Sequence, residues 1–264
     1  MTFIAASLES GYDDTGTGEP ALLCIPGWCG DRSVFAGLTA GLGANRRTLA
    51  MDLPEHGTRP RTGADLRTDD VVRDAQTLLD AEQIERVVPV ALSHAGWAAI
   101  ELRRRLGADR VPGIVLLDWM VLGPPPGFVD ALAGLQDPTA WADVRSGLFA
   151  MWTTGLDIPA LDRYVDGMGE YGAAYWHCAG REISTAFAAE GTPLAALERL
   201  DEPCPTLHLY AQPADDAVLA AQQDYAAAHP WFRAHRLPAR SHFPMFEVPG
   251  EMNTVIEDFA CGLS

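Results

Sequence analysis

The sequence predicts an α/β fold, in which a mostly parallel sheet has helices on both faces. Two observations point to it: strand-like and helix-like segments alternate along the chain, and the strand-like segments are apolar throughout. Uniformly apolar strands are typical of a sheet that is covered on both sides. The length of 264 residues and the 48% hydrophobic content are enough for one domain with a large core.

Each expected element follows from a local pattern. Short apolar runs that end in turn residues predict strands at 20–28, 46–57, 85–92, 111–119, 204–210 and 231–237. Helical spacing predicts helices at 68–83, 96–107, 215–229 and from about Pro249 onward. Thr68 is the expected N-cap of the first helix, and Gly107 is the expected end of the second.

A middle segment interrupts this alternation. Residues from about 123 to 200 are rich in Trp, Met, Gly and Tyr and have mostly helical patterns. We interpret them as a cap inserted over the carboxyl edge of the sheet, within a single domain that spans 1–264. The sheet is expected to resume near Pro203.

Composition narrows the classes of partner. The formal net charge of −17 disfavours phosphate backbones and anionic lipids, so a small molecule is expected rather than nucleic acid or membrane. The five cysteines are scattered and show no zinc-binding pattern, which indicates reduced thiols in a cytoplasmic protein and no metal site. The N-terminus lacks the pattern of a signal peptide, and no apolar run is long enough to span a bilayer. The oligomeric state is left open.

The stretch "ALSHAGW", residues 91–97, predicts a catalytic turn. A strand, a sharp turn at Ser93 and a helix form the nucleophile-elbow arrangement, which exposes the serine hydroxyl above the sheet. The tight turn requires small neighbours, which here are Ala91 and Ala95. The backbone N–H of His94 is then free to stabilise an oxyanion. In "IPGWCGD" the backbone N–H of Trp28 is a second candidate donor, although an ordinary Pro-Gly turn explains that string as well.

A base and an acid complete the expected constellation. His242, in "ARSHFPMFEVP", lies between the last strand and the last helix. Hydrolases with a nucleophile elbow in an α/β fold carry their catalytic histidine at this place. Asp118 ends an apolar strand, where a carboxylate needs a partner, and we favour it as the acid. Asp215 and Asp216 are the alternative, but a helix N-cap explains their "ADD" stretch more simply. Structural roles are expected for the remaining histidines: His208 in the core, His56 in a turn, His229 and His235 near the surface, and His177 in the cap.

At this point the sequence resembles a specific family, the cofactor-independent 3-hydroxy-4-oxoquinoline and 3-hydroxy-4-oxoquinaldine (2-alkyl-3-hydroxy-4-quinolone) 2,4-dioxygenases of the α/β-hydrolase fold. The resemblance runs over nearly the whole chain. The strings that carry it are "PGWC", "SHAGW" followed by "IEL", "LDW", "GLFAMW", "HPWF" and "HFP…EVP". It implies a ring-cleaving enzyme that uses dioxygen as co-substrate, needs no metal or organic cofactor, and releases carbon monoxide and an N-acylanthranilate.

The resemblance also implies roles for individual residues. His242 would take the proton of the substrate's 3-hydroxyl group, with Asp118 orienting it, and Ser93 would hydrogen-bond the substrate without attacking it. Trp28 and His94 would supply backbone donors near the 4-oxo group. Trp152 would lie beside the substrate ring. For Cys29, a place at the edge of the pocket and a purely structural role are equally compatible with the sequence.

Three positions depart from the family pattern. Leu92 and Gly30 stand where the best-known members have histidines, and Ala95 replaces a glycine. The loss of two polar groups favours a more apolar pocket that takes a longer 2-alkyl chain. The cap tryptophans Trp141 and Trp176 are further candidates to stack on a flat substrate, although tryptophans in helices more often belong to the core.

Two other functions remain open at the level of the sequence, because this fold supports many chemistries. One is a serine hydrolase, such as an esterase, that uses Ser93, His242 and Asp118. The other is a non-catalytic protein that keeps the pocket and binds its ligand without turnover. The preferred 2-substituent, and the choice between nutrient degradation and destruction of a signal, are not determined by the residues.

Overall fold

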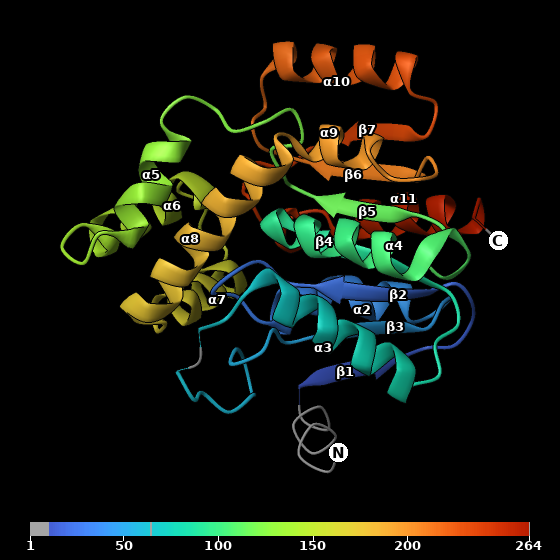
Figure 1. Cartoon of the computed structure of the whole chain (residues 1–264), viewed down its shortest axis with the longest axis horizontal. Coiled ribbons are helices and arrows are strands. Elements are labelled where there is room, and N and C mark those ends of the chain that lie inside the picture. Colours follow the sequence, from blue (N-terminus) through green and yellow to red (C-terminus); the bar gives the residue numbers. More distant parts are fainter. Residues whose placement is uncertain (1–10, 64, 264) are drawn as a thin grey trace.

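A seven-stranded sheet forms the centre of the computed structural model, which describes residues 11–63 and 65–263 (Figure 1). Its strands are β1 (Tyr12–Thr15), β2 (Ala21–Ile25), β3 (Thr48–Met51), β4 (Val87–Leu92), β5 (Ile114–Leu117), β6 (Thr206–Tyr210) and β7 (Phe232–Arg236). Their order across the sheet is β1-β3-β2-β4-β5-β6-β7. Only β1 runs antiparallel to its neighbour, so the predicted mostly parallel sheet is confirmed.

Helices cover the two faces of this sheet. In Figure 1, α3 (Thr68–Ala81) and α4 (Gly96–Arg110) lie in front of it, and α2 (Ala36–Leu42) and α11 (Pro249–Cys261) lie behind it. α10 (Asp216–Ala228) packs beside β7. Strand β2 shows why both faces are apolar: Leu22 and Cys24 enter one core cluster, while Leu23 and Ile25 enter the other.

Five helices stand between β5 and β6 in the chain. They are α5 (Phe128–Gln136), α6 (Trp141–Thr153), α7 (Pro159–Gly169), α8 (Ala173–Glu190) and α9 (Pro193–Glu198). Figure 1 places α5 to α8 beyond the carboxyl ends of the parallel strands, where the arrowheads point. The carboxyl edge is where open α/β sheets bind their ligands. None of the helices in 11–63 and 65–263 is long and apolar enough to cross a membrane.

Local details differ from the expectations. Thr68 is the first residue of α3 and not its N-cap, which is Arg67. The reason is a tertiary contact, because the backbone N–H and the hydroxyl of Thr68 both donate to the Glu182 carboxylate on α8. At Gly107 the helical backbone breaks as predicted, with φ of 77°, but one more turn follows it. No apolar pattern predicts β1 and α2, which carry acidic residues and glycines, respectively.

Candidate active site

Ser93 lies at the sharp turn between β4 and α4, in the short 3-10 helix Ser93–Ala95. Its φ of 55° falls in the left-handed region, which costs a non-glycine residue conformational energy and is typical of a nucleophile elbow. The small residues Ala91 and Ala95 flank it as expected. The strained turn places the Ser93 side chain in the wall of a pocket.

His242 and Asp118 form a hydrogen-bonded pair beside this turn. The distance from His242 Nδ1 to Asp118 Oδ1 is 2.9 Å, and the Asp118 side chain is almost completely buried. The other carboxylate oxygen accepts from the backbone N–H groups of Ala211 (2.6 Å) and Gln212 (3.1 Å). An ionised carboxylate only accepts hydrogen bonds, so His242 carries its proton on Nδ1 and leaves Nε2 free to act as a base.

The two competing acids lie elsewhere. The Asp215 side chain accepts from the backbone N–H of Ala217 at 2.7 Å and caps α10, as the "ADD" stretch suggested. Asp216 forms an exposed ion pair with Arg236. Of the three candidates, therefore, the structure brings only Asp118 to His242.

The helix α6 holds the histidine loop in place. The backbone N–H of His242 donates to the carbonyl oxygen of Trp152 at 2.8 Å. The two rings also stack, with centroids 5.2 Å apart and planes 24° apart. In addition, Gln212 Nε2 donates to the carbonyl oxygens of Met151 and Arg240, at 3.1 Å and 2.8 Å. The helix and the loop are thus joined by a backbone hydrogen bond, by a ring stack and by the side-chain amide of Gln212.

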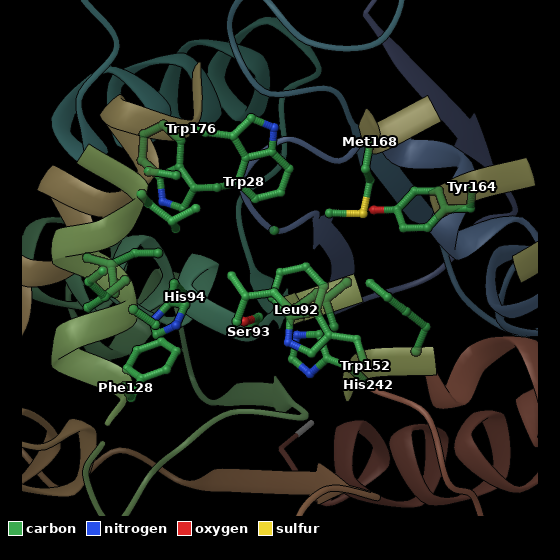
Figure 2. A pocket seen from close by; sticks show the side chains of 18 residues that line it. Trp28, Leu92, Ser93, His94, Phe128, Trp152, Tyr164, Met168, Trp176 and His242 are labelled. Carbon is green, nitrogen blue, oxygen red and sulfur yellow. The ribbon is translucent and has the colours of Figure 1, made fainter. Parts of the chain in front are cut away.

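The pocket next to the pair encloses roughly 580 Å³ of empty space, part of it open to solvent. Figure 2 shows Ser93 near its centre, His242 and Trp152 together below it, Trp28 above it, and Tyr164 and Phe128 on opposite sides. A second set of lining residues comes from α5 and α8 and is entirely apolar. We call it the apolar arm, and it consists of Ala131, Leu132, Leu135, Ala179 and Ile183. A pocket with aromatic walls and few polar groups suits a flat organic molecule with an apolar substituent.

His56 holds the loop that carries Trp28 in place, a role that was not predicted from the sequence. Cys29 is fully buried, has a φ of 59°, and donates its backbone N–H to His56 Nε2 at 3.2 Å. The other ring nitrogen of His56 is 2.8 Å from the Pro54 carbonyl oxygen. Burial lowers the pKa of His56 to about 4, so the ring stays neutral and can accept. Because "PEHG" reads as a plain turn, no local pattern shows that it anchors a loop 27 residues earlier.

The remaining expectations divide into two groups. Trp28, His94, Trp152 and Trp176 all line the pocket, but Cys29 does not, because its side chain points into the core. Trp141 and His177 pack against each other and are also absent from the pocket wall. His208 is the expected core residue: it bonds Gln222 at 2.6 Å, and burial lowers its pKa to about 4. Three aromatic lining residues were not anticipated, namely Phe128, Tyr164 and Phe243.

A metal centre has no set of ligands in the described part of the chain. Within residues 11–63 and 65–263, no three or more His, Cys, Asp or Glu side chains gather in a way that could hold a metal ion.

Known proteins resemble this chain over most of its length. The family model "Alpha/beta hydrolase family" matches residues 22–255. A 2-heptyl-3-hydroxy-4(1H)-quinolone dioxygenase of Mycobacteroides abscessus is 35% identical over 97% of this chain and 96% of its own. A 1H-3-hydroxy-4-oxoquinoline 2,4-dioxygenase of Pseudomonas putida is 30% identical, over 94% of each chain. Among solved structures, an AqdC variant in complex with its substrate, the Pseudomonas quinolone signal, superimposes with a TM-score of 0.91 at 35% identity. That match covers 97% of this chain and 98% of the other.

Proposed function

We propose a reaction from the premise that this chain belongs to the alpha/beta hydrolase family and, within it, to the 3-hydroxy-4-quinolone 2,4-dioxygenases. The chain opens the ring of 3-hydroxy-4(1H)-quinolones with dioxygen. Carbon monoxide and an N-acylanthranilate are the products. The observation that carries the proposal is the His242–Asp118 pair at 2.9 Å, set in a pocket walled by aromatic rings. Near-full-length likeness to dioxygenases of this substrate class supports the same reaction.

The reaction needs little from the protein beyond a stabilised anion. Triplet dioxygen reacts slowly with closed-shell molecules, but an electron-rich anion can transfer one electron to it. The two radicals combine to a peroxide at ring carbon 2, which then attacks carbon 4. Collapse of that bridge expels carbon 3 as carbon monoxide, and both oxygen atoms remain in the acylanthranilate. We therefore propose that neither a metal nor an organic cofactor takes part.

The roles of the site residues follow from this scheme. His242 Nε2 takes the 3-hydroxyl proton, and the Asp118 carboxylate stabilises the imidazolium that forms. The backbone N–H groups of Trp28 and His94 hold the 4-oxo group as it gains negative charge. The Ser93 hydroxyl donates a hydrogen bond to the substrate and forms no covalent bond with it. Trp152, stacked on His242, borders the ring of the bound quinolone.

Anaerobic mixing with a 3-hydroxy-2-alkyl-4-quinolone tests this function directly. We expect the absorbance of the substrate anion to appear on binding. Carbon monoxide should be released only after oxygen is admitted, with one molecule formed for each molecule of substrate consumed. Protein treated with a chelator and free of flavin should turn over at the same rate. Covalent labelling of Ser93 by a serine-directed probe, together with ester cleavage and no carbon monoxide, would support the serine hydrolase instead.

The apolar arm supports a 2-alkyl substituent, because each methylene buried contributes about 0.8 kcal/mol. Ala131→Phe should shorten the arm and exclude about two methylenes, which lowers kcat/KM for the 2-heptyl substrate by at least about tenfold. The 2-methyl substrate should be cleaved nearly as before. Val129→Phe is the matched control, since Val129 lies on the same helix but is 59% exposed. Equal losses for both substrates in Ala131→Phe would contradict this assignment.

The proposal extends to the organisation and location of the protein. We propose a single domain in which about 123–200 form a cap over the carboxyl edge of the sheet. All five cysteines are unpaired, which supports the reducing environment of the cytoplasm.

A further inference from the structure

The side chain of His94 has a fixed partner on the side away from the pocket. Its Nδ1 accepts a hydrogen bond from Trp119 Nε1 at 3.1 Å, and both residues are buried. The other ring nitrogen, Nε2, has no hydrogen-bond partner among the residues that the structure describes. Figure 2 shows the His94 ring in the pocket wall, between Phe128 and Ser93.

This contact defines the protonation state of the ring. An indole N–H can only donate, so Nδ1 must be the accepting nitrogen. Burial, with a smaller contribution from the nearby His242, lowers the pKa of His94 to about 3, so the ring is neutral. A neutral imidazole carries one proton, which must then sit on Nε2. The ring therefore presents a donor, and not a lone pair, on the side that Trp119 does not occupy.

The surrounding chain is built to keep this contact. A Cβ atom at Gly96 would lie only 2.2 Å from the Trp119 ring, so glycine is required for the indole to reach His94. Phe128 stacks on the His94 ring, with centroids 5.6 Å apart and planes 18° apart. Phe187 meets it edge-on at 5.7 Å, so aromatic rings pack against the His94 ring from two directions.

We propose that Trp119 is a positioning residue that holds His94 in the Nε2–H tautomer, so that the His94 side chain donates a hydrogen bond to an anionic oxygen of the bound substrate. This rests on the proposed function, and it adds a side-chain donor to the backbone N–H of the same residue. In the opposite tautomer the Nε2 lone pair would repel the anion and compete with His242 for the proton. Trp119 thus separates the roles of two histidines that share one pocket.

Trp119→Phe tests the proposal because it removes the indole N–H and keeps an aromatic ring. We expect kcat/KM for ring cleavage to fall at least about tenfold, up to the roughly 10²- to 10³-fold that complete loss of one oxyanion-hole donor produces. The fraction of bound substrate present as the anion without oxygen should fall with it. Trp97→Phe is the matched control: Trp97 packs against Trp119 at 4.8 Å, but its own buried Nε1 has no partner in the described residues. It should stay within about twofold of the unmodified protein.

A double-mutant cycle separates positioning from packing. In His94→Gln, the side-chain NH₂ group can donate to the substrate whether or not residue 119 donates to the amide oxygen. Adding Trp119→Phe to this variant should therefore change kcat/KM by less than about twofold. If Trp119→Phe causes the same loss in both backgrounds, Trp119 does not act through His94 and the proposal fails.

Nitrogen NMR of the histidine-labelled protein reads the tautomer without any substrate. We expect His94, identified by its absence in His94→Gln, to have a protonated Nε2 and an unprotonated Nδ1. A protonated Nδ1 would overturn the proposal even if Trp119→Phe did not fold. Failure of the unmodified protein to cleave quinolones would reject the proposed function and leave this tautomer result standing, so the two failures are distinguishable.

Discussion

Replacement of His242 by alanine is expected to lower kcat/KM for quinolone cleavage by roughly 10²- to 10⁴-fold, the usual contribution of a general base. The variant keeps the pocket but loses the imidazole that the buried Asp118 carboxylate orients at 2.9 Å. Ser93→Ala should be much milder, since the proposed serine only donates a hydrogen bond, worth about 1 kcal/mol. Steady-state oxygen consumption and carbon monoxide release measure both variants.

The comparison between the two variants identifies the type of chemistry. A serine hydrolase would lose nearly all activity in both, because nucleophile and base act as one unit. Equal and severe losses in His242→Ala and Ser93→Ala would therefore contradict the dioxygenase mechanism. Far-ultraviolet circular dichroism checks that both variants keep the fold.

Asp118→Asn is expected to reduce kcat by about three to four orders of magnitude while the protein still folds. Two backbone N–H groups, of Ala211 and Gln212, donate to Asp118 Oδ2, so an asparagine must place its oxygen there. Its NH₂ group then faces His242 Nδ1 and forces that nitrogen to accept. The proton moves to Nε2, and the histidine can no longer act as a base toward the substrate.

The acid at the start of α10 supplies the control for this substitution. Asp215→Asn changes the same chemical group in a residue that only caps a helix, and asparagine caps helices about as well as aspartate. Its kcat should equal that of the unmodified protein. If Asp118→Asn retained full activity, the buried carboxylate would have no part in orienting the base.

One pocket holds two histidines for which we propose opposite tasks, and their partners account for the difference. A carboxylate at Nδ1 makes His242 carry its proton there and accept at Nε2. An indole N–H at Nδ1 of His94 has the reverse effect, because that partner donates. The two rings are chemically identical. The group behind each ring decides which of its two nitrogens carries the proton. In the mechanism that we propose, the neutral donor and the base can then act on the same anion without exchanging roles.

Much of the fold was predictable because its signals are local. The uniformly apolar strands report burial on both faces, which is enough to indicate a parallel sheet with helices on both sides. The small residues around Ser93 report the tight turn in the same way. Elements without such a signal were missed, as the acidic edge strand β1 shows: its side chains are mostly exposed, so no apolar pattern marks it.

By itself, the sequence determined the class of fold, the serine turn, and the choice of His242 and Asp118 as a pair to look for, since each depends on short-range periodicity or on an element boundary. Only the tertiary structure decided what stands behind each functional group. His56 beneath the Trp28 loop, Trp119 behind His94, and the apolar arm all join segments far apart in the chain. A contact between segments far apart in the chain leaves no periodic trace in the residues around either partner, so it becomes visible only once the strands and helices have been packed together.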